Sequence, residues 1–384
     1  MTYAYMTLLF FMLLLELRIS RRKFSPTVVM ISLWLIIILL CDIFSDELWE
    51  LSSETLTWIS LGCVAFFFGV IFGKAIAPAR FVFSPVKRMP LWMVMPIYGV
   101  MIALFYLMVQ SGAGEDDNWY VGIRRIINYG EPDWSFSAFG YIYYLIYPVL
   151  YLSAVRYYSS QNNKKDRNIF WFHFGMCFMY ALMSTAKLKL LLVVIPVFFI
   201  RSYYRPTSTK LLVIVGALFS SALFGSLLLL NKLSGNDGIT DIIVTTIGNY
   251  TFFNVFAIDK LNFMPILQGK CIGSENACSI MPFFDYGDFS TNIYTIMYSF
   301  VEYGMAAYIA FQFFIGMIHN AIDRVARTSF NVFAVVFSAV LYVPLVFQIM
   351  DNQYTASKYM LYIMTLSYML YFIKSRNISL LKRV

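Results

Sequence analysis

Charged residues are scarce in this 384-residue chain: they make up 13% of it, against 60% hydrophobic and 19% aromatic residues. A soluble domain carries about 25% charged residues, because its surface must face water. Long uncharged runs recur from one end of the sequence to the other. These proportions exclude a soluble enzyme, a disulfide-rich secreted scaffold and a disordered tail protein. They indicate an all-α, polytopic integral membrane protein.

Histidine and the common cofactor motifs are also lacking. The two histidines, His173 and His319, fall within or at the cytoplasmic end of apolar runs, and we expect packed polar residues rather than ligands. GxGxxG, Walker A, HExxH and paired CxxC motifs are all absent. The sequence therefore predicts no metal site and no cofactor. Membrane insertion, rather than nucleic acid, explains the net charge of +8.

Eleven apolar segments are candidates to cross the membrane, for which a helix needs about 20 residues. They lie at 2–17, 27–44, 56–73, 90–109, 138–155, 169–184, 190–200, 211–230, 305–322, 330–350 and 359–373. The seventh is long enough only if Lys187 and Lys189 sit at its mouth with their side chains extending outward. We predict a single membrane-embedded domain over 1–384.

Basic residues are sorted to one side of these spans. Of the 29 Lys and Arg residues, 21 fall on one side, and 18 of the 21 acids fall on the other. This bias predicts that the N-terminus lies outside and the C-terminus in the cytoplasm. The basic side carries only three acids, Glu16, Asp166 and Asp323. The first apolar run has no basic residues before it and no small-residue cleavage site, so we expect an uncleaved span.

Two external connections are long, at 110–137 and 231–304, so we expect function on the outer face. Cys271 and Cys278 flank six residues of the larger loop, where the compartment is oxidising, and we predict a disulfide between them. The other cysteines lie in apolar runs and should be buried: Cys41, Cys63 and Cys177.

The second half of the larger loop is the most informative. Region 239–263 is too polar to span and too apolar to be a free loop, so it should lie at the membrane surface or enter the protein. Ser290 is then placed to cap a helix that continues to Gly304. At 100° per residue its polar stripe would carry Asn292, Thr295, Ser299 and Glu302, flanked by Tyr298 and Tyr303. Such a stripe suits a sugar site, or it is an amphipathic helix with its polar face in water.

Cations on the outer face form two further clusters. Arg124 and Arg125 are the only arginines there, and planar guanidinium groups bind phosphate through two-point contacts. They favour a lipid pyrophosphate, or alternatively ordinary phospholipid head groups. Lys187 and Lys189 lie at an external turn between two spans. Either both extend toward water, or Lys187 points inward to a polyanion while Lys189 faces the membrane interface.

These features resemble the O-antigen polymerases of the Wzy type, inner-membrane enzymes that join undecaprenyl-pyrophosphate-linked repeat units. The resemblance lies in about eleven spans, two long periplasmic loops, arginines in the first loop, and three motifs: STAK at 184–187, STNIYT at 290–295 and FVEYG at 300–304. Many relatives carry arginine where this chain has Lys187, which weakens the case for two-point phosphate binding at that position.

The resemblance implies a GT-C-like glycosyltransferase in the bacterial inner membrane that uses no nucleotide sugar. Its partners would be membrane lipids, lipid-linked oligosaccharides and a chain-length regulator protein. The pyrophosphate would be held by Arg124, Arg125 and Lys187. The acceptor's proton would pass to Glu302, Asp288 or Asp285. The sugar rings would be oriented by Asn292, Tyr294, Tyr298 and Tyr250.

Three alternatives remain. An O-antigen ligase shares the topology, but that family relies on a histidine in its large periplasmic loop, where this chain has none. A lipid-linked oligosaccharide flippase, which is a transporter, would concentrate charge within its spans and keep its loops short. A membrane-bound O-acyltransferase would need an intramembrane histidine with a polar partner, and His319 beside Asn320 lies close to the cytoplasmic rim.

Overall fold

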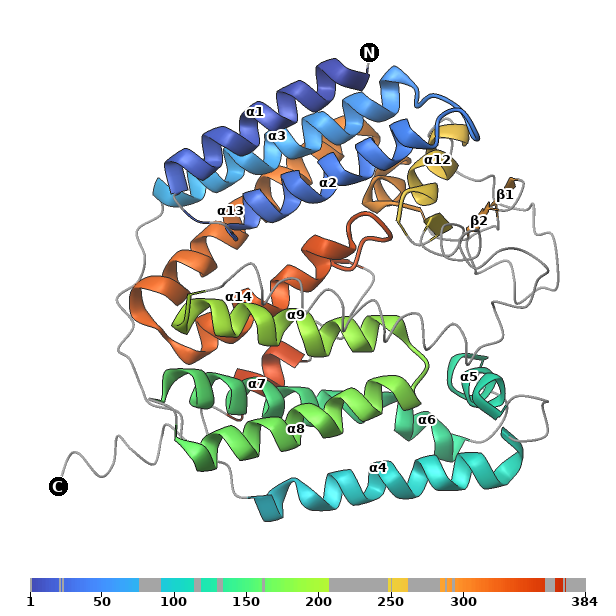
Figure 1. Cartoon of the computed structure of the whole chain (residues 1–384), viewed down its shortest axis with the longest axis vertical. Coiled ribbons are helices and arrows are strands. Elements are labelled where there is room, and N and C mark those ends of the chain that lie inside the picture. The colour runs from blue at the N-terminus through green and yellow to red at the C-terminus, as the bar shows by residue number, and fades with distance from the viewer. Residues whose placement is uncertain are drawn as a thin grey trace. The chain divides into compact units, whose positions relative to one another are not determined.

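A computed structural model describes most of the chain (Figure 1). The described residues are 2–20, 22, 24–75, 91–113, 119–129, 134–160, 163–206, 248–249, 251–261, 284–286, 289–291, 294–355, 363–368 and 370. The chain folds into two compact units. Unit 1 comprises Met1–Pro78, Asn236–Arg324 and Pro344–Ala356, and unit 2 comprises Ala79–Gly235, Val325–Val343 and Ser357–Val384.

Six helices in the described part are long and apolar enough to cross a membrane. They run over Thr2–Ser20, Pro26–Ile43, Ser53–Lys74, Leu91–Ser111, Ala138–Ser159 and Gly304–Ser329. Each coincides with a span predicted from the sequence, so a mostly helical membrane protein is confirmed at this level. The predicted spans at 169–184, 190–200 and 330–350 are also largely helical, whereas 211–230 lies outside the described residues and 359–373 is described only in part.

Unit 1 is built on α1 (Thr2–Ser20), α2 (Pro26–Ile43) and α3 (Ser53–Ala75), which lie side by side (Figure 1). Helix α2 begins where the Ser25 hydroxyl accepts a hydrogen bond from the Val28 amide, with Pro26 in its first turn. The unit also contains most of α13 (Gly304–Ser329).

Glycines let α3 and α13 approach closely within unit 1. A Cβ atom added at Gly69 would overlap the Phe313 carbonyl, and one at Gly316 would overlap the Phe66 carbonyl. At Gly73 it would lie 2.8 Å from the carbonyl oxygen of Met317. Small residues at such crossings bring two backbones together in membrane proteins, where packing rather than hydrophobicity holds helices side by side.

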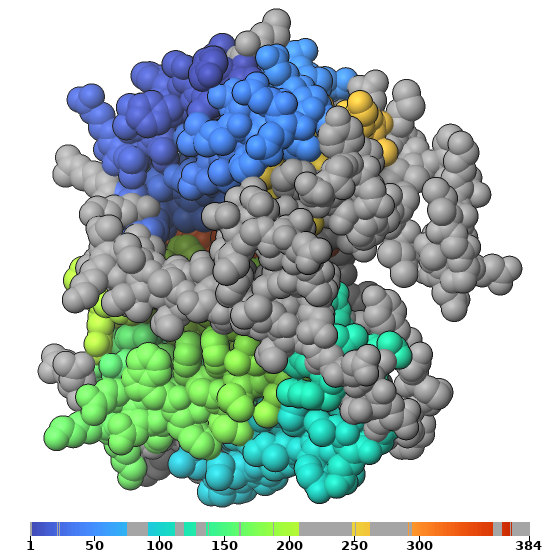
Figure 2. Space-filling view, turned by 45° about the vertical axis from the view of Figure 1, so that its right-hand side comes forward, coloured from blue at the N-terminus to red at the C-terminus, as the bar shows by residue number. Residues whose placement is uncertain are grey.

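The elements of the large loop pack at one end of unit 1. They are α12 (Phe253–Lys260), the antiparallel pair β1 (Phe284–Tyr286) and β2 (Phe289–Thr291), and the 3₁₀-helix η4 (Ile296–Phe300). Helix α12 contacts α2, α3 and β2. Residues 253–259 are all buried, although part of α12 shows at the surface beside the blue helices in Figure 2. This part of the predicted 239–263 region therefore enters the protein.

The helix expected between Ser290 and Gly304 does not form, so that prediction was wrong. Ser290 belongs to strand β2 and pairs with Asp285. The cap is instead Thr295, whose hydroxyl accepts a hydrogen bond from the Met297 amide and starts the short η4. A turn at 301–303 separates η4 from α13. Since strand, 3₁₀-helix and turn have different periodicities, the predicted polar stripe is not present.

Unit 2 packs α7 (Tyr143–Ser159), α8 (Lys164–Met183) and α9 (Lys187–Tyr204) against one another (Figure 1). Helix α4 (Met95–Met108) ends in a π-helical turn at Val109–Ala113 and is followed by α5 (Trp119–Tyr129) and α6 (Trp134–Tyr141). Most of α14 (Val332–Phe347) also belongs to this unit. The Tyr203 and Ser338 hydroxyls join α9 to α14 at 2.6 Å.

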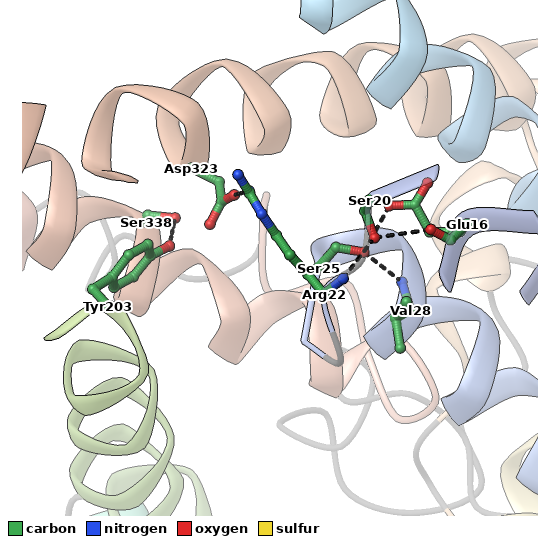
Figure 3. Close-up of polar contacts among 8 residues, drawn as sticks. All are labelled: Glu16, Ser20, Arg22, Ser25, Val28, Tyr203, Asp323 and Ser338. Carbon is green, nitrogen blue, oxygen red and sulfur yellow. Dashed lines mark hydrogen bonds and ion pairs between the residues drawn. The ribbon is translucent and has the colours of Figure 1, made fainter. Parts of the chain in front are cut away.

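The three acids that the sequence places on the basic side are all buried and hydrogen-bonded. In unit 1, Asp323 accepts a hydrogen bond from Arg22 at 3.0 Å, and Glu16 accepts one from Ser25 at 2.9 Å (Figure 3). In unit 2, Asp166 accepts one from Arg156 at 2.9 Å. Their exposures are 1%, 1% and 3%, respectively. They are therefore internal partners rather than part of a surface facing water.

These contacts distinguish two ends of unit 1. Arg22 lies between α1 and α2, and Arg324 donates a hydrogen bond to the Lys74 carbonyl near the end of α3. The last turns of α1 and α3 and the Asp323–Arg324 part of α13 therefore lie near the start of α2, and we call this the basic end of unit 1. The opposite end, which we call the loop end, contains the α2–α3 turn with α12, η4 and the β-strands.

Candidate functional site

One predicted cluster forms around α5 in unit 2. Tyr120 and Ile123 are buried at 3% and 0% exposure. Helix α5 contacts α6 and the π-helical turn at Val109–Ala113. The Tyr120 hydroxyl donates a hydrogen bond of 2.7 Å to the backbone carbonyl of Leu182 in α8. The amphipathic α5 is therefore held against the end of α8 by apolar packing and by this hydrogen bond.

The two outer arginines occupy the less buried part of α5: Arg124 is half-buried and Arg125 is exposed. Burial raises the pKa of the Tyr120 phenol, and the positive charge of Arg124 opposes that rise. Arg124 is therefore close enough to act on the phenol electrostatically. Because the phenol is bonded to Leu182, this also places Arg124 near the end of α8.

Helix α9 begins five residues after Leu182, at Lys187. The turn before it includes Thr185 at a φ of 53°, and the cap residue Ala186 offers no side-chain acceptor to the first amides of α9. The structure thus brings Arg124, Arg125 and an uncapped helix N-terminus to one end of unit 2. The Lys187 side chain lies outside the described part of the chain. Helix N-termini of this kind favour anions, because their N–H groups point outward.

The Lys189 ammonium contacts α7 and α8 rather than extending toward water or the membrane interface, so the Lys189 part of both alternatives was wrong, while the inward position of Lys187 stays a prediction. The Lys189 ammonium donates a hydrogen bond of 3.2 Å to the Tyr180 hydroxyl. It lies 5.1 Å from the ring centroid of Tyr180 and 5.4 Å from that of Tyr143. Contacts with the faces of aromatic rings stabilise a cation away from water. Lys189 therefore joins α9 to α7 and α8.

The predicted sugar-binding residues are only partly described. Tyr294 and Tyr298 stack with ring centroids 4.9 Å apart. Tyr294 is 1% exposed and burial raises its pKa to about 12, whereas Tyr298 is half-buried. Of this pair, Tyr298 is the ring with surface left for a ligand. The other two predicted sugar-binding residues, Asn292 and Tyr250, lie outside the described part of the chain, and so do Cys271 and Cys278 of the predicted disulfide.

Of the three predicted carboxylates, only Glu302 has a described side chain. Glu302 is exposed in the turn before α13 and makes no hydrogen bond or ion pair within the described part of the chain. Asp285 lies in β1, with its side chain outside the described residues, and Asp288 is not described. Glu302 is thus accessible, and no group among the described residues orients it.

Asp259 has a structural role at the loop end of unit 1. Its carboxylate accepts hydrogen bonds from the Trp49 indole at 3.0 Å, the Ser52 amide at 3.0 Å and the Thr55 hydroxyl at 2.6 Å. It is 8% exposed. A carboxylate bonded to this many donors holds α12 against the α2–α3 turn and leaves little room for a ligand.

Asp351 is a carboxylate that sequence reasoning missed. It follows α14, is half-buried, and accepts hydrogen bonds from the Asn352 amide at 2.6 Å and the Gln353 side chain at 2.7 Å. Burial raises its pKa, and these two donors only partly oppose the rise. A raised pKa on an oriented carboxylate is common at functional sites. The polar run DNQY directly after an apolar span was the available signal.

A buried polar network surrounds this segment. The Gln312 amide donates a hydrogen bond of 3.0 Å to the Gln348 side chain, and the His319 ring and Tyr354 hydroxyl lie 2.7 Å apart. In unit 2, His173 pairs in the same way with Tyr98 at 2.7 Å. Both histidines are 1% exposed, which confirms that they are packed polar residues. The prediction that Cys41, Cys63 and Cys177 are buried is also confirmed.

The predicted site residues therefore fall into two groups. Arg124, Arg125 and Lys187 belong to unit 2, whereas Glu302 and the tyrosine pair belong to unit 1. Comparisons with protein-family models, with curated proteins and with solved structures each found no match. The chemistry of these two groups is thus the basis for assigning a function.

Proposed function

We propose that the chain is a surface-polysaccharide polymerase of the O-antigen type, a glycosyltransferase that joins undecaprenyl-pyrophosphate-linked oligosaccharides. The observation that carries the proposal is the hydrogen bond from Tyr120 of α5 to Leu182 near the end of α8, five residues before α9 begins. It gathers Arg124, Arg125 and the uncapped N-terminus of α9 at one end of unit 2. These groups suit a pyrophosphate, because they combine forked donors, positive charge and outward-pointing amides.

The proposed reaction transfers the growing glycan from its lipid carrier to a second lipid-linked unit. Arg124, Arg125 and Lys187 hold the donor's pyrophosphate and stabilise the charge that develops as it departs. A hydroxyl at the non-reducing end of the acceptor forms a bond to the donor's anomeric carbon as the bond to the pyrophosphate breaks. The hydroxyl's proton passes to a carboxylate. Glu302, Asp288 and Asp285 stay candidates for this role.

The proposal includes a GT-C-like arrangement of about eleven spans in the bacterial inner membrane, with the loop end of unit 1 facing the periplasm. The position of Arg22 and Arg324 at the basic end of unit 1 supports this orientation, since Lys and Arg residues gather at the cytoplasmic ends of membrane spans. Cysteines introduced at Ser137 and Ser274 should react with an impermeant thiol reagent, and one at Ser208 should not. Labelling of position 208 in intact cells would reverse the orientation.

Deletion of the gene tests the function most directly. A polymerase defect leaves single repeat units on the lipid carrier or on lipopolysaccharide, and the wild-type gene should restore the polymer ladder. Long polymer that stays on the carrier would instead indicate an O-antigen ligase. Repeat units trapped in the cytoplasm would indicate a lipid-linked oligosaccharide flippase.

A further inference from the structure

Lys189 carries a positive charge that no acid in the described part of unit 2 balances. The only Asp or Glu residue there is Asp166, which accepts a hydrogen bond of 2.9 Å from Arg156. Asp166 precedes Tyr180, the hydrogen-bond partner of Lys189, by 14 residues of α8, or about 21 Å along the helix. An ionisable group held inside a membrane protein normally has a partner, and its presence marks a functional site.

The ammonium of Lys189 has hydrogen-bonding capacity left. It donates one hydrogen bond, of 3.2 Å, to the Tyr180 hydroxyl, and it lies 5.4 Å from the ring centroid of Tyr143. The Tyr180 hydroxyl in turn donates a hydrogen bond of 2.7 Å to the Phe139 carbonyl, which places the ammonium near α6. An ammonium has three N–H donors, and the described residues supply no second acceptor. Lys189 is half-buried, so part of its side chain still meets the surface.

The turn before α9 holds a second unsatisfied group. Thr185 has a φ of 53°, a left-handed conformation that β-branched residues rarely adopt. Its side chain is 7% exposed, yet its Oγ1 atom makes no hydrogen bond within the part of the chain that the structure describes. Strained backbone is concentrated at functional sites, and buried polar atoms are normally hydrogen-bonded. Both features of Thr185 therefore indicate a ligand at this turn.

The same turn is bonded to the helix that carries the outer arginines (Figure 1). The Leu182 carbonyl accepts two hydrogen bonds, one of 3.1 Å from the Thr185 amide and one of 2.7 Å from the Tyr120 phenol of α5. Arg124 follows Tyr120 by one helical turn, and Lys189 lies in the first turn of α9. The turn therefore joins the helix that carries Arg124 to the helix that carries Lys189.

The chemistry of these groups selects among ligands. A metal cation would be repelled by the lysine and arginine charges, and a neutral sugar would leave those charges unbalanced. Pyrophosphate carries negative charge over several oxygen atoms, which accept hydrogen bonds from an ammonium, a hydroxyl and backbone amides alike. It therefore suits Lys189, Thr185 and the uncapped N-terminus of α9 together.

We propose that Lys189 and Thr185 bind the donor's pyrophosphate, together with the outer arginines of α5. Lys189 donates its unused N–H groups to pyrophosphate oxygens, and the Thr185 hydroxyl donates one further hydrogen bond. The Lys189 charge then stabilises the negative charge that develops as the pyrophosphate departs. Identifying the anion as part of the lipid-linked donor rests on the proposed polymerase function, whereas the binding of pyrophosphate itself does not.

Thermal unfolding of the purified full-length chain in detergent tests the site with inorganic pyrophosphate as the probe. Pyrophosphate should raise the unfolding temperature of the wild type with increasing concentration, and phosphatidylglycerol added to the micelles should not. Lys189→Met and Thr185→Val should each weaken pyrophosphate binding about 10- to 100-fold, because each removes hydrogen bonds to a charged group. Lys260→Met, which should not weaken it, is the matched control, since Lys260 lies 5.2 Å from the Trp49 ring in unit 1.

Stability without pyrophosphate separates binding from a structural role. Methionine keeps the apolar contact of Lys189 with the tyrosine rings, and valine keeps the shape of Thr185. Without the probe, both variants should unfold at the same temperature as the wild type or higher, because each removes a polar group that lacks its full set of partners. Lys189→Arg keeps the charge, so it should bind pyrophosphate more tightly than Lys189→Met.

Any of three results would overturn the proposal. Pyrophosphate could fail to stabilise the wild type, or could bind both variants as tightly as the wild type. Phosphatidylglycerol could stabilise the wild type as well as pyrophosphate does, which would indicate a lipid head-group site. Lys189→Met could unfold at a lower temperature without the probe, which would mean that the chain itself neutralises Lys189. A failure of the polymerase assignment is separate, because it would show as a normal polymer ladder in the deletion strain and leave pyrophosphate binding unchanged.

Discussion

The Tyr120 phenol donates a hydrogen bond of 2.7 Å to the carbonyl of Leu182, the penultimate residue of α8. This bond connects an amphipathic helix of the first long loop to the end of α8, just before the turn that leads into α9. It determines where Arg124 lies, because Arg124 is one helical turn away from Tyr120 on α5. Positioning of the outer arginines therefore depends on a residue that carries no charge at neutral pH.

Tyr120→Phe should weaken the docking of α5 without unfolding unit 2. The ring packing remains, and the loss of one hydrogen bond costs about 1 kcal/mol. We expect a shorter polymer ladder at normal protein level, together with faster proteolysis within residues 110–137. Tyr141→Phe is the matched control, since Tyr141 is 61% exposed in α6. A ladder of wild-type length from Tyr120→Phe would mean that this bond does not position the arginines.

Arginine-to-lysine changes test the two-point contact with pyrophosphate. Arg124→Lys and Arg125→Lys keep the charge but lose the planar fork, so at the critical position the ladder should shorten or disappear. Alanine at that position should abolish it. The measurement is the ladder on a gel, with protein level verified, and Arg18→Lys at an exposed position of α1 serves as control. If lysine supports a normal ladder at both positions, charge alone is sufficient and the head-group alternative gains support.

The positions of the helices could be predicted from sequence because a membrane span depends mainly on the length of an apolar run. The same reasoning succeeds for His173, His319 and the buried cysteines, since each is surrounded by apolar residues in the chain itself. Such properties are local. They can be predicted from neighbouring residues in the chain, without knowing which helices pack together in the fold.

The site could be predicted only in part, because its remaining features depend on distant partners. The local sequence makes Ser290 a candidate helix cap, but in the fold Ser290 pairs with Asp285 in a β-strand, and the Ile296 amide bonds to the Gln348 carbonyl rather than extending a helix. Lys189 looks like a membrane-facing lysine until Tyr180 and Tyr143 are placed beside it. Tertiary contacts of this kind override local propensity, and no periodicity in the sequence reports them.

The Glu302 carboxylate can be tested by removing its basicity alone. Glu302→Gln keeps its size and most hydrogen bonds, and loss of a general base typically lowers a rate by 10²- to 10⁴-fold. We expect elongation to stop at one repeat unit without a change in protein level. A normal ladder would move the role to Asp288 or Asp285, tested singly by Asp→Asn. Normal ladders from all three variants would exclude these predicted carboxylates and leave Asp351 as the next residue to test.

Asp351 should make stability depend on pH in a direction set by its burial. Its pKa is raised above the ordinary value of 3.8, so the folded state favours the protonated form. Binding of this proton stabilises the folded state. The stabilisation is fully present at pH values below 3.8 and is lost as the pH rises through the folded-state pKa of Asp351. Asp351→Asn imitates the protonated form at every pH. The variant and the wild type should therefore unfold at similar temperatures near pH 4, and the variant should unfold at the higher temperature near pH 7.

Thermal unfolding of the purified chain in detergent measures this difference at both pH values. The exposed Asp46 provides the control, because Asp46→Asn should show no pH-dependent difference from wild type. If the wild type were the more stable protein near pH 7, the hydrogen bonds from Asn352 and Gln353 would outweigh the cost of burial. Asp351 would then be a structural acceptor like Asp259, and its ionised form would already be stabilised by the fold. A more stable variant that also shortens the ladder would instead show that the buried carboxylate is kept for function at the expense of stability.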